Sequence, residues 1–295
     1  MNRRKFMKDA GASMTVAALP AGICAQEAVI PARPIPATGE LLPIIGFGSS
    51  PVFGGEDYET ASELLDALRN MGGKFIDTWP AAQPTLGRYA RENSAHDDLF
   101  LATNVRTETA EADLRAIEAA KQQQGKPVLD MLQLARPDDF NEQWKRMLRW
   151  KEEGHAKYIG FAIARNNLYD MVESVIRNGA DFVQLNYSMI EPDAGDKLIP
   201  LAHDNGVAVI TNRPFVNGQY FPMVQGRELP TWTAEFDCDT WAQFSLKWII
   251  SNPLVNCAIT ETSKFRHAVD NLSAGLGRLP DEDQRNRMQA FMRSI

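Results

Sequence analysis

Short apolar runs alternate along this chain with longer segments in which apolar residues recur at helical spacing. The runs predict strands at residues 44–48, 74–78, 99–105, 129–135, 158–162, 182–187, 207–211 and 257–260. The amphipathic segments predict helices at residues 57–71, 85–92, 107–123, 140–153, 168–178, 194–205, 240–250 and 264–274. Four of these helices have a plausible capping residue at their start, namely Thr107, Asp139, Asn167 and Asp239.

Continuous apolar strands separated by helices indicate a parallel sheet that is covered by helices. Eight such units in roughly 230 residues predict an α/β fold of the (β/α)8 TIM-barrel type. The competing topology is an open doubly wound sheet, which carries a glycine-rich turn after its first strand. Gly46 and Gly48 supply two glycines there but no third follows, so the pattern favours the barrel.

The first 25 residues differ from the rest of the chain. Arg3 and Arg4, followed by Phe6 and Lys8, precede an uncharged stretch rich in alanine and glycine, which is typical of a twin-arginine export signal. We therefore expect a periplasmic or otherwise exported protein, with cleavage after Ala25. A lipid anchor at residue 24 and a chance arginine pair are the alternatives. The stretch is too short and too weakly apolar for a stable membrane span.

Residues 26–43 contain four prolines and predict an extended linker, so residues 44–295 remain for a single barrel domain. The chain holds 31 basic and 38 acidic residues, and this net charge of −7 argues against a nucleic-acid partner. Cys238 and Cys257 are expected to pack as small apolar residues. The chain has no Cys or His pair at zinc spacing, so no metal site is predicted.

Six motifs in order resemble strands and segments of the aldo-keto reductases, over about residues 41–275. They are GGKFIDT at 72–78, LFLAT at 99–103, DMLQLARPD at 130–138, YIGF at 158–161, VQLNY at 183–187 and DNL at 270–272. The resemblance implies a catalytic Tyr, Lys, Asp and His near the carboxyl ends of the strands. Only the Asp is matched, by Asp77.

At the other three catalytic positions this chain carries Ala82 for the Tyr, Asn104 for the Lys and Ala135 for the His. Tyr89 is the nearest tyrosine downstream, but it lies within a predicted helix and is expected to pack in the core. Loss of a general acid costs a factor of roughly 10² to 10⁴ in rate. The sequence therefore predicts that this is not a conventional NADPH-dependent carbonyl reductase.

The resemblance also implies a nicotinamide nucleotide, and the residues for it are retained only in part. Gln184 matches a nicotinamide contact, and Asp270 and Asn271 match the contacts to the adenine. Other expected contacts are replaced: Ala162-Ile163 stands for a Ser-Asn pair, Asn212-Arg213-Pro214 for a stacking aromatic, and Glu261 and His267 for the cations that hold the 2′-phosphate. The cofactor is therefore predicted as none or NAD(P), with NAD favoured over NADP because a carboxylate repels that phosphate.

Arginines follow several predicted strands, where they could converge on the barrel mouth and hold an anion. The predicted ligand-binding residues are Trp79, Asn104, Arg106, Arg136, Asn186 and Arg213. Arg165 also follows a strand, and Tyr187 could form a wall of the pocket. The alternatives are that the arginines pair with acids such as Asp138 or Glu191, and that the aromatic residues belong to the core.

Two functions stay open at this point. The first is an exported barrel of this fold that binds or transforms a small anionic molecule without carbonyl reduction. The second is an NAD(P)-dependent oxidoreductase whose tightly held nucleotide is acquired before export. The sequence gives no positive sign of a pure interaction protein and predicts no oligomeric state.

Overall fold

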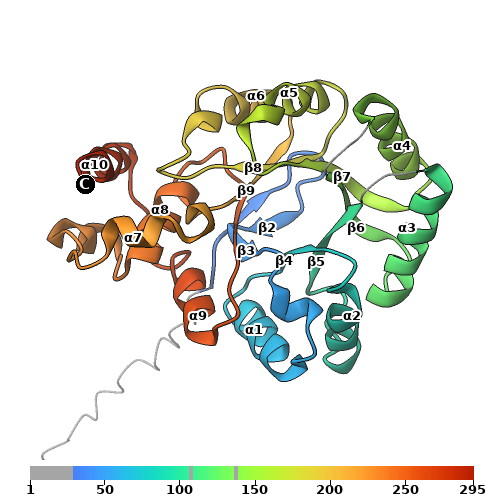
Figure 1. Cartoon of the computed structure of the whole chain (residues 1–295), viewed down its shortest axis with the longest axis horizontal. Coiled ribbons are helices and arrows are strands. Elements are labelled where there is room, and N and C mark those ends of the chain that lie inside the picture. Colours follow the sequence, from blue (N-terminus) through green and yellow to red (C-terminus); the bar gives the residue numbers. More distant parts are fainter. Residues whose placement is uncertain (1–28, 106–108, 136–138) are drawn as a thin grey trace, which may run out of the picture.

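A computed structural model describes residues 29–105, 109–135 and 139–295 of the 295-residue chain. Eight parallel strands form a closed barrel (Figure 1), which confirms the predicted (β/α)8 fold. In chain order they are β3 (Ile45–Phe47), β4 (Phe75–Thr78), β5 (Phe100–Val105), β6 (Leu129–Ala135), β7 (Ala156–Ala162), β8 (Phe182–Asn186), β9 (Ala208–Asn212) and β10 (Cys257–Thr260). Pairing of β10 with β3, with Ala258 opposite Ile45, closes the barrel.

Helices surround the barrel (Figure 1) and match the predicted segments within a few residues. They are α1 (Tyr58–Asn70), α2 (Gln83–Glu92), α3 (Ala110–Gln124), α4 (Phe140–Glu152), α5 (Tyr169–Arg177), α6 (Leu198–Asp204), α8 (Trp241–Ile250) and α9 (Phe265–Ser273). Of the predicted caps, Asp139 is confirmed, since its carboxylate accepts from the Glu142 N–H. Thr109 rather than Thr107 caps α3, and Thr240 rather than Asp239 caps α8. Thr107 lies outside the described residues.

Asn167, the fourth predicted cap, lies inside the 3-10 turn η2 (Asn166–Leu168), and α5 has no side-chain cap. Two helices were not predicted: α7 (Tyr220–Val224) and the C-terminal α10 (Glu282–Arg293). Asp281 and Gln284 form a reciprocal capping box at the start of α10. The described residues include no helix long and apolar enough to cross a membrane.

The proline-rich segment before the barrel forms an antiparallel hairpin of β1 (Ala32–Pro34) and β2 (Leu41–Pro43). This corrects the prediction of an extended linker for residues 32–43. Ile35 and Leu42 are fully buried and belong to the same cluster as the side chains of the barrel lumen. The hairpin therefore closes the amino-terminal end of the barrel, which we call the barrel bottom.

Two apolar clusters make up the core. The lumen cluster includes Phe75, Phe100, Tyr158 and Phe182, and the larger cluster lies between the strands and the helices. Side chains alternate along each strand between these two clusters. The lumen positions continue upward two residues at a time, so Asp77 follows Phe75 and Gln184 follows Phe182 toward the carboxyl ends of the strands.

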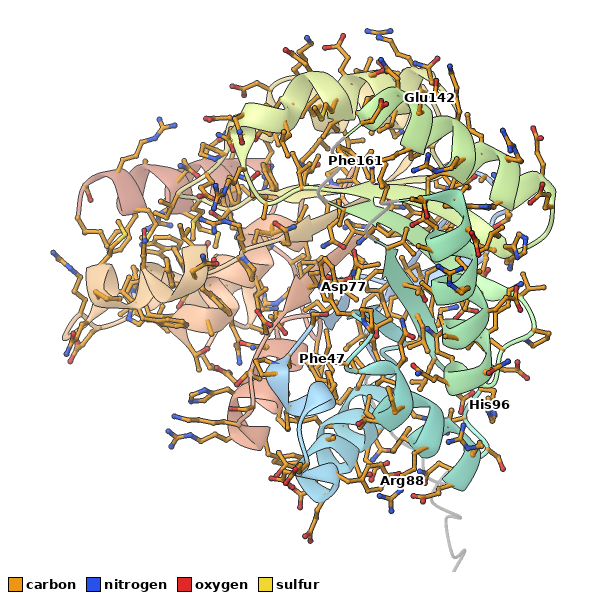
Figure 2. The ribbon with its side chains drawn as sticks, turned by 45° about the vertical axis from the view of Figure 1, so that its right-hand side comes forward. Phe47, Asp77, Arg88, His96, Glu142 and Phe161 are labelled. Carbon is orange, nitrogen blue, oxygen red and sulfur yellow. The ribbon has the colours of Figure 1, made fainter. Side chains whose placement is uncertain are left out.

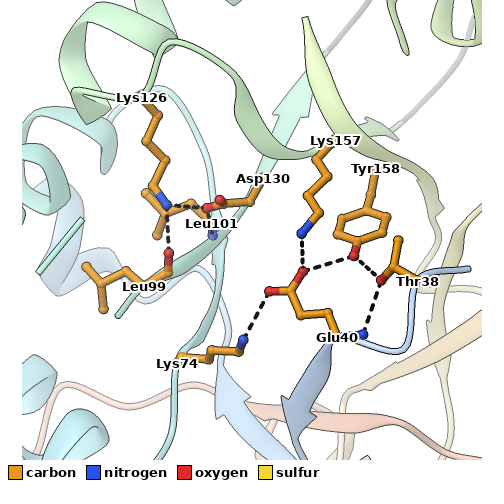
Figure 3. Close-up of polar contacts among 9 residues, drawn as sticks. All are labelled: Thr38, Glu40, Lys74, Leu99, Leu101, Lys126, Asp130, Lys157 and Tyr158. Carbon is orange, nitrogen blue, oxygen red and sulfur yellow. Dashed lines mark hydrogen bonds and ion pairs between the residues drawn. The ribbon is translucent and has the colours of Figure 1, made fainter. Parts of the chain in front are cut away.

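Charged side chains at the barrel bottom are paired with one another (Figure 3). The Glu40 carboxylate accepts from Lys74 Nζ at 3.2 Å, from Tyr158 Oη at 2.9 Å and from Lys157 Nζ. Burial raises the pKa of Glu40, but these three donors outweigh burial and leave the pKa below its ordinary value. The hairpin is thereby held to two strands of the barrel by ionic contacts.

Candidate functional site

Asp77 lies near the top of the lumen, at the carboxyl end of β4, where barrel enzymes carry their chemistry. Figure 2 shows it near the centre of the barrel, far from Arg88 of α2 and from His96 in the turn that follows this helix. Its side chain is 7% exposed. A carboxylate at such a place needs hydrogen-bond partners, because burial without them is costly.

The side-chain partners of Asp77 are carboxamides from two other strands, and a carboxamide from a third strand joins these two into a closed ring. Asn104 Nδ2 donates to Asp77 Oδ1, and Gln184 Nε2 donates to Asp77 Oδ2 at 3.3 Å. Opposite Asp77, Gln133 Nε2 donates to Asn104 Oδ1 at 3.1 Å and to Gln184 Oε1 at 3.3 Å. We call these four residues the amide ring.

The direction of every hydrogen bond in the amide ring follows from the carboxylate. An ionised Asp77 can only accept, so Asn104 and Gln184 must each turn their NH2 group toward it. Their oxygens then face Gln133, which uses its own NH2 group for both. Gln133 Oε1 is left buried without a partner. The ring thus replaces the Asp–Lys pair that the family resemblance implies with neutral amide donors.

The charge state of Asp77 reflects this setting. Burial raises the pKa of Asp77 to about 6, and the nearby negative charge of Glu261 adds to the rise, while the hydrogen bonds from Asn104 and Gln184 oppose it. A carboxyl group with such a pKa can give up or take a proton close to neutral pH. Asp77 is therefore chemically suited to proton transfer, although its two oxygens are engaged by the ring.

Alanines stand at two other positions implied by the resemblance, and both are buried. Ala82 precedes α2 and is 6% exposed, and Ala135 ends β6 and is 4% exposed. Tyr89 points away from the lumen: its hydroxyl donates to Asp66, accepts from Arg69 and is buried enough to have a pKa of about 12. Its predicted packing role is confirmed. Among the described residues, the donors to the Asp77 carboxylate are amides rather than a tyrosine hydroxyl or an ammonium.

Arg213 does follow β9 at the mouth, but it is engaged by Glu191, the alternative left open by the sequence. Arg213 Nε donates to Glu191 Oε2 at 3.0 Å and Nη2 donates to Oε1 at 2.8 Å, a fork-to-fork pair. The guanidinium is 21% exposed, and the hydrogen bonds to Glu191 raise its pKa. Arg213 also has a φ of 57°, in the left-handed region.

Asn186 joins the same group of contacts, since its Nδ2 donates to Asn166 Oδ1 at 2.7 Å and to Glu191 Oε2 at 3.1 Å. Arg165 is exposed just before η2. Arg106 and Arg136, predicted to bind the anion, lie outside the described residues. The convergence of arginines is therefore described for Arg213 alone, and there the charge is neutralised by an internal carboxylate.

Of the two aromatic residues predicted near the pocket, only Trp79 lies beside one. Trp79 lines a pocket of about 370 Å³ together with Asn104. Tyr187 is 3% exposed and packs on Trp248 with ring centroids 5.0 Å apart, and Arg285 Nη2 donates to its hydroxyl at 3.0 Å. The core alternative is therefore confirmed for Tyr187.

Two of the three residues predicted to hold a nucleotide, Gln184 and Asp270, are already engaged in contacts within the protein. Both polar atoms of Gln184 are used by the amide ring. The Asp270 carboxylate accepts from Thr240 Oγ1 at 2.9 Å and from Gln243 Nε2 at 2.8 Å, and Asn271 is 3% exposed. A nucleotide that used these groups would have to exchange its own hydrogen bonds for the present ones.

Two lumen residues were missed in the sequence: Gln133 and Asn212. Both lie on inward-facing positions, and Asn212 pairs in register with Asn186 on the neighbouring strand. Asn212 Nδ2 donates to the Ile163 carbonyl at 2.7 Å, so its oxygen and that of Asn186 face the lumen without a partner. Their inward orientation could have been predicted from the alternation of side chains along β6 and β9, counted from the bulky lumen residues below them.

Within the described ranges, His, Cys, Asp and Glu residues form no group that could hold a metal ion. Cys238 and Cys257 are both buried free thiols, as predicted, and burial raises the pKa of each. The candidate site is thus a neutral amide layer around one perturbed carboxyl group.

The profile of the aldo/keto reductase family matches residues 44–291, which is most of the chain. The chain belongs to the aldo/keto reductase family. No curated protein matches it. Among solved structures, the holo form of an aldo-keto reductase from Bacillus halodurans aligns with a TM-score of 0.71 and 18% identity, over 88% of this chain and 96% of that one. An aldo-keto reductase from Klebsiella pneumoniae in complex with NADPH aligns with a TM-score of 0.70 and 20% identity, over 86% and 92%.

At these identities the structural likeness shows the fold. The family assignment agrees with the motifs read from the sequence and with the closed barrel. Asp77 of the amide ring lies in one of these motifs, GGKFIDT, and Asn104 directly follows another, LFLAT.

Proposed function

We propose that this protein is a member of the aldo/keto reductase family that does not reduce carbonyl compounds by the family's proton-donor route. The observation that carries this proposal is the amide ring. Asp77 is held by Asn104 and Gln184, and Ala82 and Ala135 stand at two further catalytic positions implied by the resemblance. An amide or a methyl group cannot supply a proton to a carbonyl oxygen at neutral pH.

The test is a direct one on the purified protein. NADH and NADPH are titrated calorimetrically, and oxidation of each is followed with a panel of aldehydes and ketones. We expect no turnover above the uncatalysed rate and no nucleotide affinity in the micromolar range. Efficient reduction of any of these carbonyl compounds would overturn the proposal.

We further propose a small anionic ligand at the barrel mouth. Support comes from the fork-to-fork pair of Arg213 and Glu191, because the Glu191 carboxylate occupies the guanidinium as the carboxylate of a ligand would. An anion would bind by displacing Glu191. Arg106 and Arg136 retain their predicted roles but lie outside the described residues.

Thermal-shift measurements with acetate, sulfate and phosphate test this ligand class. The variant Glu191→Gln should respond to lower anion concentrations than the wild type, because the competing charge is removed, and Arg213→Ala should not respond. Arg177→Ala is the matched control, since Arg177 is paired with Glu173 on the outer face of α5. Equal responses of Arg213→Ala and Arg177→Ala would refute a role for Arg213.

A nucleotide-dependent oxidoreductase remains the second candidate. It is favoured by the solved aldo-keto reductases of similar fold, three of which contain NADP or NADPH, and by the presence of Gln184, Asp270 and Asn271. The same titration decides between the two functions. Micromolar binding of NAD or NADP would support this candidate, and it would show that Gln184 leaves the amide ring when the nucleotide binds.

We also propose export through the twin-arginine pathway, on the strength of Arg3 and Arg4 and the uncharged stretch that follows them. The full chain is expected in the periplasmic fraction of an expressing bacterium. Replacement of Arg3 and Arg4 by Lys should retain it in the cytoplasm. Unchanged periplasmic recovery of that variant would exclude this pathway.

A further inference from the structure

The pocket beside Trp79 lies outside the barrel lumen, between α2 and α3 and above the ends of β4 and β5. Figure 1 shows these two helices as neighbours on the barrel wall. Its floor is formed by Thr103, Asn104 and Val105 of β5, and its sides are formed by the β4–α2 connection and by α3. The volume of about 370 Å³ lies within the range of small-molecule sites.

The wall contributed by α3 is low because its side chains are small. Ala116 and Ala119 are exposed and lie one turn apart on the face of α3 that borders the pocket, and Gln123 continues the same row. A row of alanines alone does not make a binding site. It does leave room for a flat molecule to lie between the helix and Trp79.

Gln83, at the first position of α2, gives the pocket a specific polar feature. It lines the pocket and is 3% exposed. Its backbone N–H donates to the Pro80 carbonyl at 3.3 Å, but the described part of the chain offers its side-chain carboxamide no hydrogen-bond partner. Its carboxamide atoms are not among the fully buried polar atoms that lack a partner, so they can be reached from the pocket.

Neighbouring polar groups contrast with Gln83. Asn104 uses both amide hydrogens within the protein, on Asp77 and on the Thr78 carbonyl at 3.1 Å. Thr103 Oγ1 accepts from Gln124 Nε2 at 2.9 Å. The described residues that line the pocket include no charged side chain. A ligand would therefore meet the free carboxamide of Gln83, and that of Gln123 where the pocket meets the surface, within largely apolar walls.

From this geometry we infer that the pocket binds a small, neutral, planar molecule with an amide-type edge, which pairs with the Gln83 carboxamide through two hydrogen bonds while its ring lies beside Trp79. A primary amide, a lactam or a similar heterocycle offers one donor and one acceptor on adjacent atoms, the complement of a carboxamide. A charged ligand is disfavoured, because the pocket offers it no counter-charge. The site is separate from the proposed anion site at the lumen mouth, and it stands whether or not that proposal holds.

Calorimetric titration of the full protein with three probes of nearly the same shape tests the ligand class. Benzamide carries the complete amide edge, acetophenone lacks its donor, and benzoate replaces it with a charge. Benzamide should bind at least about tenfold more tightly than acetophenone, because the Gln83 carbonyl is left unpaired by the ketone. Benzoate should bind more weakly still. Absence of benzamide binding, or a preference for benzoate, would overturn the inference.

Three variants test whether benzamide binds in this pocket. In Gln83→Leu, benzamide affinity should fall about tenfold or more, while the melting temperature should not fall, because the substitution removes no side-chain hydrogen bond within the described part of the protein. This pair of results separates loss of the site from loss of the fold. Ala119→Phe should block the pocket, and Gln122→Phe, at an exposed position of the same helix that does not line the pocket, is its control. Equal binding by these two variants would place benzamide elsewhere and refute the site.

Discussion

The two ends of the barrel lumen are built from different chemistry. At the barrel bottom, the rings of Phe100, Phe75, Tyr158 and Phe182 pack with centroids 5.4–5.9 Å apart, and the charges around Glu40 are paired. At the top, the amide ring surrounds Asp77, and three side-chain amide oxygens remain buried without partners.

The contrast shows that stabilising apolar packing and polar side chains occupy opposite ends of the same strands. Three of the barrel strands, β4, β5 and β8, each contribute a large ring below and a polar side chain two or four residues above it. Burial of the packed aromatic layer stabilises the folded state. Amide oxygens that are buried without hydrogen-bond partners reduce this stabilisation. The top of the barrel is therefore the part of the fold that can accommodate ligand chemistry, because little of the stability depends on it.

The largest expected effect is the comparison of two residues of β5, one at each end. Phe100→Ala removes a ring that contacts three others and should lower the free energy of unfolding by ~3–5 kcal/mol. Asn104→Ala, four residues further along the same strand, should cost clearly less, about 1–3 kcal/mol, because it leaves a buried carboxylate with one donor fewer. Urea denaturation measures both. Equal losses would contradict the division between the two ends.

The next effect concerns the charge of Asp77. Its pKa is raised by burial to about 6 in the folded protein, against about 3.9 in the unfolded chain. The folded state therefore binds the proton more tightly, so stability should decrease as the pH rises from 4 to 6 and level off above that range, by an amount on the order of 2–3 kcal/mol.

Unfolding free energies from pH 4 to 8, compared with those of Asp77→Asn, isolate this contribution, because the variant cannot titrate there. A carboxyl-carbon NMR titration gives the midpoint directly. Removal of an amide donor in Gln184→Leu should move the midpoint upward, since the hydrogen bond from Gln184 favours the ionised form. A downward shift would show that the amide ring does not stabilise the carboxylate.

A smaller effect is expected from the ionic cluster at the barrel bottom. Glu40→Gln removes the charge that faces Lys74 and Lys157 and should cost about 1–2 kcal/mol, a moderate value because the carboxylate is 29% exposed. Since the pKa of Glu40 is lowered on folding, this stabilisation is present above the ordinary glutamate pKa and is lost as the pH falls through the lower folded value. The variant and the wild type should therefore converge in stability in acid, as thermal unfolding at pH 7 and pH 3 would show.

Strands and helices with a regular hydrophobic pattern could be predicted from the sequence, whereas elements without such a pattern could not. The strands β6 and β10 have the predicted bounds because continuous apolar runs ended at both sides. The β1–β2 hairpin was missed because three-residue strands that contain prolines carry no period. The helix α10 was missed because only Met288 and Met292 are buried on it, too few to form an apolar stripe.

For the site, the sequence indicated that Asp77 and Asn104 share one opening, and their hydrogen bond agrees. It did not indicate that Gln133 completes a ring, because that depends on which amide nitrogens face one another across the lumen. The arginine prediction met a similar limit at Arg213. An arginine that follows a strand can reach the barrel mouth. Whether its guanidinium is available to a ligand depends on the loop that carries Glu191.

The smallest effect is expected at Arg213, where the backbone conformation destabilises the folded state and the side-chain ion pair stabilises it. Its φ of 57° is unfavourable for any residue with a Cβ, by roughly 1 kcal/mol relative to glycine, while its pair with Glu191 is partly exposed and contributes at most about 1 kcal/mol. Arg213→Ala should therefore lose stability, and Arg213→Gly should recover most or all of the loss. Paired urea titrations of the two variants measure this difference. If alanine and glycine proved equal, the backbone would have relaxed, and the left-handed turn would depend on the ion pair rather than hold it in place.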